Sequence, residues 1–266
     1  MRRDITYVNG ITLEEAAEIT RHCFFRDDEM ELVERQIRNQ QDFSNAYGSL
    51  INYWKFERCL AEMHSCTGRE TFYYYGNCSV CNSPQPFIVD YQFSEDVEGK
   101  RVPNWRERLI CPNCGCNSRQ RFIIHKIFDC YSSDMQILMY EQASNVFEKV
   151  KREIPKVKGF EYVGDCRGEQ KAIDGIVLED ICELSYMDEE FSLLVSNDVF
   201  EHVYDYEKAF LEAYRVLKPG GKLLFTVPFD GNSATTARRV EKDGDGFIYT
   251  QSQWYHDCAV AGQAPL

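Results

Sequence analysis

Residues 180–229 constrain the fold of this chain more than any other part of the sequence. An apolar run at 191–195 is followed by an amphipathic segment at 206–217, and a Lys-Pro-Gly-Gly turn then leads to a second apolar run at 222–227. Short apolar runs on either side of a segment with helical periodicity are typical of two parallel strands joined by a crossover helix. This order predicts half of a doubly wound α/β sheet.

The same alternation of strands and helices extends towards the N-terminus. We expect strands at 135–140, 159–163 and 176–178, and a helix that Ser144 caps and that continues through residue 154. Residues 131–266 are therefore predicted to form one α/β domain.

Two other parts precede this domain. Residues 1–65 are predicted to be a helical segment, because Thr12 and Glu15 have the spacing of a capping box and apolar side chains recur at helical spacing after them. Residues 66–130 combine short β-like runs, turn residues and paired cysteines, which predicts a separate small module.

The paired cysteines of this module have the spacing of a metal site. Cys78-x2-Cys81 and Cys111-x2-Cys114 are separated by 29 residues, and two such pairs can supply all four ligands of a tetrahedral Zn²⁺ ion. A site with no open position is structural, and it would stabilise a module too small to have a sufficient core. Cys116 is a competing ligand, and a redox or iron–sulfur role or unligated thiols are the alternatives.

Charge limits the classes of partner. The net charge of −13 argues against a general affinity for nucleic acids or anionic membranes, since both are bound mainly through Lys and Arg. Residues 100–126 are a local exception, with seven cationic residues and the single acid Glu107. This cluster is interpreted as a solvated face, with a zinc-ribbon nucleic-acid binder as the alternative.

The sequence also bears on location. Its N-terminus has no apolar core of a signal peptide, and no apolar run approaches the roughly 18 residues that span a bilayer. Metal ligation and buried thiols account for the twelve cysteines better than secreted disulfides do. We expect a cytoplasmic protein with no membrane partner, and no oligomeric state follows from the sequence.

Residues 180–229 resemble the central half of a class I S-adenosylmethionine-dependent methyltransferase of the type 11 group. That family has an acid, then LPF-D-SFD-V, then EHV and LKPGG-L. The matching residues are Asp180, Leu184, Ser185, Tyr186, Asp188, Phe191, Val195, Glu201, His202, Val203, Leu217, Lys218, Pro219, Gly220, Gly221 and Leu223. The cysteine module likewise resembles a ribbon fused to bacterial methyltransferase-like domains. The resemblance implies a Rossmann-like sheet and S-adenosylmethionine as cofactor.

The family places a Gly-x-Gly loop after its first strand, where the backbone approaches the methionine end of the cofactor. Here Glu141 replaces the first glycine, and Ala143 and Ser144 complete the corresponding loop. Ser144 can cap the following helix, whose N–H groups suit a carboxylate. The resemblance therefore assigns Glu141, Ala143 and Ser144 to cofactor binding.

Three further positions are assigned to the nucleoside by resemblance. Glu161 ends the second strand and is expected to accept the ribose hydroxyls, while Asp180 is expected to accept the adenine amino group and Ile181 to pack on the ring. The alternatives are an exposed strand-end acid for Glu161 and a turn cap for Asp180.

The loop after the fourth strand lies beside the transferring methyl group in the family. Ser196 is therefore assigned to the cofactor, and Asn197, Asp198 and His202 to the acceptor. His202 can act as a general base because imidazole titrates near neutrality, although a hydrogen-bonded structural histidine is an alternative. Methyl transfer depends mainly on alignment, so few acid–base residues are expected.

Two departures bear on function. Residues 166–175 are a short connection between the second and third strands for a crossover that contains a helix, and the sequence ends soon after the fifth strand. The expected function is methyl transfer to a small molecule, sugar or glycan precursor. The alternative is a non-catalytic binding or scaffold protein with a degenerate methyltransferase fold and a structural zinc ribbon.

Overall fold

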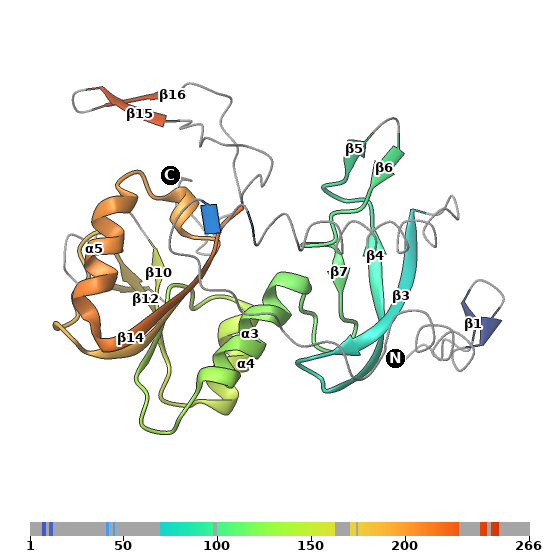
Figure 1. Ribbon diagram of the computed structural model, residues 1–266, viewed down its shortest axis with the longest axis horizontal. Coiled ribbons are helices and arrows are strands. Elements are labelled where there is room, and N and C mark those ends of the chain that lie inside the picture. The colour runs from blue at the N-terminus through green and yellow to red at the C-terminus, as the bar shows by residue number, and fades with distance from the viewer. Residues whose placement is uncertain are drawn as a thin grey trace. The chain divides into compact units, whose positions relative to one another are not determined.

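The computed structural model describes residues 7–8, 11–12, 41–42, 45, 70–97, 100–162, 171–173, 175–228, 240–243 and 246–249 (Figure 1). The chain divides into two compact units, Met1–His125 and Lys126–Leu266. Among the described residues, no helix has the length and apolar character needed to cross a membrane.

The N-terminal end contains a short antiparallel pair. β1 (Tyr7–Val8) pairs with β2 (Ile11–Thr12), and Val8 lies opposite Ile11. The Asn-Gly sequence between them is the strongest short hairpin signal, so the prediction that residue 11 is helical is wrong. Residues 41–42 and 45 are helical, and the rest of the predicted helical segment lies outside the described residues.

The first unit is built on an antiparallel sheet. β3 (Thr71–Cys78) and β4 (Ser83–Asp90) form a hairpin, and β7 (Leu109–Ile110) pairs with the other edge of β4. β5 (Glu95–Val97) and β6 (Lys100–Val102) form a separate hairpin. The hairpin turn and the residues after β7 therefore carry the two cysteine pairs.

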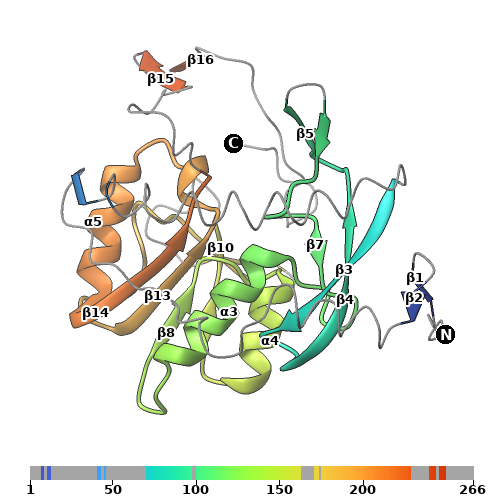
Figure 2. The same cartoon turned by 45° about the vertical axis from the view of Figure 1, so that its right-hand side comes forward.

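The second unit contains a parallel sheet. β8 (Ile137–Met139), β9 (Lys158–Gly159), β13 (Phe191–Asn197) and β14 (Leu217–Thr226) pair in the order β14-β13-β8-β9, and Figure 2 shows β8, β13 and β14 side by side. All three pairings are parallel, which confirms the predicted fold class.

A second set of strands continues this arrangement. Only Phe160 separates β9 from β10 (Glu161–Tyr162), and its N–H donates to the carbonyl of Met139. β10 then pairs in parallel with β12 (Ile176–Glu179). The parallel strands thus follow the order β12, β10 with β9, β8, β13 and β14, which is the order of a doubly wound sheet.

The described part of the short connection between β10 and β12 contains a strand. β11 (Lys171–Ile173) pairs antiparallel with β12 through a turn that contains Gly175, whose φ is +82°. Glycine adopts this left-handed conformation without steric cost. Further on, β15 (Val240–Asp243) and β16 (Gly246–Tyr249) form an antiparallel hairpin.

Helix α4 (Asn145–Glu153) packs on one face of the sheet. Ser144 caps it, as predicted, because its hydroxyl accepts from the backbone N–H of Phe147 at 3.0 Å. Phe147 comes so close to Gly159 that a Cβ there would lie 2.4 Å from its ring. The contact fixes the start of α4 against β9.

Helix α5 (Tyr206–Val216) packs through Ala209, Ala213 and Val216 against a core cluster that includes Leu138 and Leu194. Successive strand side chains point to opposite faces, so Leu138 and Met139 point to opposite sides of the sheet. Met139 is in register with Gly159, beside which α4 packs. The two helices therefore cover opposite faces.

The remaining helical segments frame these elements. α3 (Ser118–Cys130) contains the boundary between the two units, and η1 (Phe200–His202) is a single 3-10 turn between β13 and α5. η1 ends close to the carboxyl end of β13, and it carries one of the predicted site residues, His202.

Candidate functional site

The strand order places the candidate site at the carboxyl ends of β8 and β13. The chain leaves β8 towards β9 on one side, whereas β13 lies on the other side of β8. In an open α/β sheet, ligands bind outside the carboxyl ends of the strands at this reversal of strand order. Most of the predicted cofactor and acceptor residues follow these strands.

The loop after β8 is organised by Glu161. Its Oε1 accepts hydrogen bonds from the backbone N–H groups of Gln142 and Ala143, each at 2.6 Å. The acid assigned to ribose thus binds the loop that replaces the glycines, which neither the ribose assignment nor the alternative of an exposed acid anticipated. Glu141 is half-buried at the start of the same loop.

Gln142 is a site residue that the sequence reasoning missed. Its Nε2 donates to the carbonyl of Gly175 at 3.0 Å, and its Oε1 accepts from the N–H of Val177 at 2.8 Å. Gln142 therefore connects the loop after β8 to the start of β12. The local signal was only a long amide side chain between two predicted cofactor residues.

At the end of β12, Asp180 and Ile181 have separate environments. Asp180 Oδ1 accepts from the backbone N–H of Cys182 at 2.8 Å, which is the turn-capping contact considered as an alternative. Ile181 is fully buried in the core cluster beneath α5.

Glu179, which was not predicted, is also fully buried beside this turn. Its two carboxylate oxygens accept from the hydroxyl of Ser185 at 2.6 Å and from the Ser185 N–H at 3.2 Å. A buried carboxylate needs such donors. The pair holds the segment after the Asp180 turn against β12.

At the carboxyl ends of β13 and β14, Asn197, Asp198 and Thr226 form a polar group. Thr226 Oγ1 lies 3.0 Å from Asn197 Oδ1 and 2.7 Å from Asp198 Oδ1. Asp198 has a φ of +57°. A left-handed conformation is uncommon for residues other than glycine, and such residues cluster at functional sites. Thr226 was missed because it lies one strand away.

His202 lies in η1, which follows β13. Its side chain is 41% exposed, and its Nε2 is 4.0 Å from Glu201 Oε1. The structure thus brings Asn197 and Asp198 together and leaves His202 accessible at the next turn.

Two buried hydroxyl groups lie where the strand order reverses. Tyr140 directly follows β8, Ser196 lies in β13, and the two come next in register after the pair Met139 and Val195. Neither hydroxyl has a hydrogen-bond partner among the described residues. Burial also raises the pKa of Tyr140 far above its usual value. Unpaired buried hydroxyls are costly, which is consistent with a polar ligand or water here.

The residues at these strand ends partly fit an S-adenosylmethionine site. The Ser144-capped start of α4 offers backbone N–H groups of the kind that bind a carboxylate. Ser196 offers an unsatisfied hydroxyl, as its assignment to the cofactor requires. The N–H groups of Gln142 and Ala143, however, are directed to Glu161.

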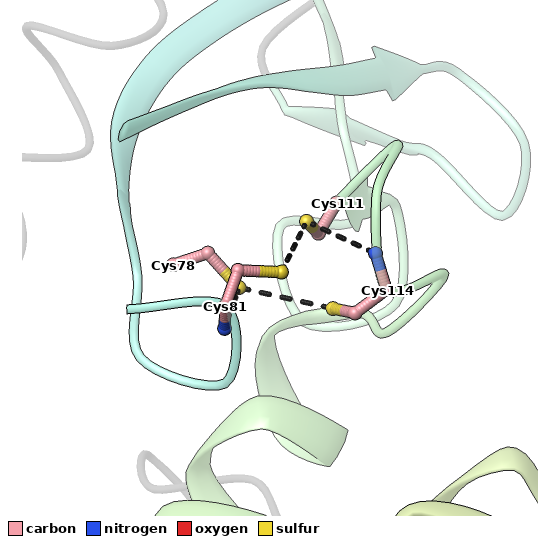
Figure 3. A group of neighbouring side chains, drawn as sticks. All are labelled: Cys78, Cys81, Cys111 and Cys114. Atoms are coloured by element: carbon pink, nitrogen blue, oxygen red, sulfur yellow. Dashed lines mark hydrogen bonds between the residues drawn. The ribbon is translucent and has the colours of Figure 1, made fainter. Parts of the chain in front are cut away.

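The first unit contains a separate candidate metal centre. The Sγ atoms of Cys78, Cys81, Cys111 and Cys114 all lie within 4.8 Å of one another. Figure 3 shows these four side chains gathered around one point. Cys78 and Cys114 are 3.7 Å apart, and so are Cys81 and Cys111. A tetrahedron with metal–sulfur bonds of about 2.3 Å has edges of about 3.8 Å. The two 3.7 Å distances therefore match the edge of a tetrahedral zinc site.

The backbone of both cysteine turns supports this arrangement. The N–H of Cys81 donates to Cys78 Sγ at 3.4 Å, and that of Cys114 donates to Cys111 Sγ at 3.5 Å. A left-handed residue follows each pair, Asn82 at +50° and Gly115 at +71°. The two turns are thus equivalent.

Cys116 lies outside the group of four. Its Sγ donates to the carbonyl of Cys114 at 3.8 Å, and the side chain is fully buried. In the part of the chain that the structure describes, it is not among the residues that could together hold the metal.

Arg121 supplies a buried positive charge beside the cysteines. Its guanidinium lies 4.2 Å from the centre of the Phe87 ring and donates to the carbonyls of Leu109 and Cys116, each at 2.8 Å. Burial lowers the pKa of Arg121, and the neighbouring cysteines oppose that shift. Four thiolates around one Zn²⁺ ion would carry a net negative charge, which the guanidinium of Arg121 would partly offset.

The other arginines of the basic cluster also have internal partners. Arg119 Nε donates to Glu107 Oε1 at 2.9 Å, and Arg108 Nε donates to Asp90 Oδ1 at 2.7 Å. These contacts use the guanidinium groups that a phosphate backbone would require. They favour a structural role for the cluster over nucleic-acid binding.

Residues 128–225 match the methyltransferase domain family. This part of the chain is therefore similar to methyltransferase domains. It contains the parallel sheet, α4 and α5, and the family resemblance of the sequence is thereby confirmed.

Individual relatives differ in the share of the chain that they match. The glycine/sarcosine/dimethylglycine N-methyltransferase of Actinopolyspora halophila is 24% identical over 211 residues, which cover 76% of this chain and 33% of that protein. The chain thus spans about a third of the length of this curated relative.

Two solved structures are of the Haemonchus contortus phosphoethanolamine N-methyltransferase 2. The complex with S-adenosylmethionine has a TM-score of 0.33 and 23% identity, covering 42% of this chain and 28% of that one. The complex with phosphomonomethylethanolamine and S-adenosylhomocysteine has a TM-score of 0.32 and 22% identity, covering 41% and 28%.

Proposed function

We propose that this chain transfers a methyl group from S-adenosylmethionine to a small-molecule acceptor. One observation carries the proposal: the stretch that matches the methyltransferase family also forms a parallel sheet whose strand order reverses between β8 and β13. This reversal defines a ligand site in a sheet of this kind. The predicted cofactor and acceptor residues follow the strands that meet there.

In this proposal, the chain binds the cofactor at the ends of β8, β10 and β12. The start of α4 beyond Ser144 receives the methionine carboxylate, and Asp180 receives the adenine amino group. Glu161 contributes mainly by accepting hydrogen bonds from the N–H groups of the loop after β8. The cofactor supplies an activated methyl group when bound, so alignment of the acceptor provides most of the rate enhancement.

The acceptor side consists of Asn197, Asp198 and His202. Asp198 is held by Thr226 in its left-handed conformation, and His202 is accessible on η1. An ammonium acceptor must lose a proton before its nitrogen can attack. Asp198 or His202 would take that proton as a general base.

A small amine is the acceptor that the comparisons favour. The curated relative is named as an N-methyltransferase of glycine, sarcosine and dimethylglycine, which supports an amine over the sugar or glycan precursor expected from the sequence. The acidic balance of the chain, with a net charge of −13, also suits a cationic amine.

Calorimetric titration with S-adenosylmethionine and S-adenosylhomocysteine tests the cofactor assignment. We expect both to bind. A methyl-transfer assay with glycine, sarcosine and free sugars then identifies the acceptor class, and the variant Asp198→Asn provides the site control. Absence of binding by either cofactor form would favour the scaffold alternative.

We also propose that the first unit binds one structural Zn²⁺ ion through Cys78, Cys81, Cys111 and Cys114. The two 3.7 Å sulfur distances and the equivalent left-handed turns support it. With all four positions filled by thiolates, the ion would stabilise the unit and take no part in the transfer reaction.

A further inference from the structure

The loop between β8 and α4 is fixed by hydrogen bonds from two side chains. Glu161 Oε1 accepts from the N–H groups of Gln142 and Ala143, while the Gln142 amide bonds to Gly175 and Val177 on the far side. The loop is therefore tied both to the end of β10 and to the start of β12.

These hydrogen bonds set the backbone path of the loop, which glycines do in other loops of this kind. A glycine loop can follow a tight path because it lacks side chains, and its backbone then approaches the ligand closely. Here the path is set by partners instead. Glu161 accepts two consecutive N–H groups from one side, and the Gln142 amide binds one backbone acceptor and one backbone donor like a short piece of strand.

We propose that Gln142 and Glu161 are positioning residues that replace the missing glycines and hold the loop so that the start of α4 faces the methionine end of the cofactor. The inference rests on the proposed function. Gln142 acts through the loop, because its amide nitrogen and its amide oxygen each bind the backbone at the start of β12. Glu161 likewise acts first on the loop.

Two ligands can distinguish a positioning role of the loop from a general effect on stability. S-adenosylhomocysteine carries the amino-acid end that the loop and α4 would contact, whereas 5′-methylthioadenosine carries the nucleoside without it. A misplaced loop should therefore weaken the binding of S-adenosylhomocysteine selectively. A general loss of stability would weaken the binding of both ligands.

Calorimetric titration of both ligands into the full chain tests this. We expect Gln142→Met, which keeps the side-chain length and removes the amide, to weaken S-adenosylhomocysteine about tenfold, as the loss of a positioning hydrogen bond allows. Binding of 5′-methylthioadenosine should change less than about twofold. Gln136→Met, the same change at the glutamine that directly precedes β8, is the matched control and should leave both affinities unchanged.

Glu161→Gln tests the second residue. The amide oxygen can still accept from the loop, so both affinities should stay within about fivefold of wild type. A larger loss of 5′-methylthioadenosine binding would place Glu161 on the ribose and overturn its positioning role.

Three other outcomes would overturn the inference for Gln142. In Gln142→Met, the affinities for both ligands could fall together, which would indicate a purely structural role. Alternatively, neither affinity could fall. If wild type binds neither ligand, the proposed function fails and this inference with it. Should Gln142→Met fail to fold, Gln142→Asn replaces it, because the shorter amide cannot reach Gly175 and Val177 together.

Discussion

Removing one cysteine ligand should unfold the first unit. Cys78 and Cys111 are 1% and 0% exposed, and each belongs to one of the two 3.7 Å sulfur pairs. Structural zinc sites bind with an apparent free energy of about 10–16 kcal/mol at pH 7. Whole domains are stable by only about 5–15 kcal/mol. Loss of the ion would therefore exceed the stability that this small unit can have.

The assay combines metal analysis with thermal unfolding of Cys78→Ser and Cys111→Ser. Wild type should contain one zinc per chain, and each variant should contain close to none and lose the unfolding transition of the first unit. Burial raises the pKa of the Cys78 thiol to about 12, so without a metal ion that thiol stays protonated near neutral pH. Zinc binding should therefore release protons.

Two controls distinguish ligands from other thiols. Cys116→Ser and Cys130→Ser should keep the zinc, because neither residue belongs to the group of four. An absorption spectrum of an iron–sulfur cluster in wild type would support the redox alternative. The reasoning is refuted if both ligand variants fold normally and wild type contains no metal.

Three further changes have defined outcomes. Asp180→Asn keeps an acceptor for the Cys182 N–H but turns a donor towards adenine, so calorimetry should show weaker S-adenosylhomocysteine binding, by about 1–3 kcal/mol, with an unchanged melting temperature. Gly159→Ala should lower the unfolding free energy by about 1–3 kcal/mol in a denaturant titration, because its Cβ would meet the ring of Phe147 at 2.4 Å. Hydrogen bonding from Arg108 lowers the pKa of Asp90, so this pair stabilises the fold above the unfolded pKa of about 3.9 and loses that effect as the pH falls through the lower folded pKa. Asp90→Asn should flatten the acid side of a stability–pH curve, and an unchanged slope would contradict the pairing.

The sequence predicted those features that depend on local spacing. Alternating strands and helices follow from short apolar runs and helical periodicity, and Ser144 is a cap because it precedes an amphipathic segment. The metal ligands follow from two short repeats of Cys-x2-Cys, and the structure brings all four together.

The features that were missed depend on contacts between distant residues. Gln142 bonds to Val177, 35 positions away, and Thr226 lies beside Asp198, 28 positions away. Nothing in the sequence near either residue shows which backbone group will face it. Strand β11 and its pairing with β12 were missed for the same reason, since the short run of β11 has no distinctive spacing.

The charge balance of the basic cluster could not be derived from residues 100–126 alone. Seven cations against one acid in 100–126 suggested an exposed positive face. The acids that neutralise part of it lie elsewhere or are shared: Asp90 pairs with Arg108 from outside the segment, and Glu107 accepts from Arg119. A count along the chain does not include partners that the fold brings in.

The acids assigned to ligand binding accept hydrogen bonds from the chain itself. Glu161 accepts from the loop after β8, Asp180 from Cys182, and Asp198 from Thr226. A carboxylate offers about four lone-pair sites, so these contacts still allow a ligand to bind the same group. An alanine at any of the three would remove the positioning contact and the ligand contact together. Asparagine or glutamine keeps an acceptor oxygen for the donor within the chain and removes the charge. Only these amide variants can therefore separate the positioning contact from the ligand contact.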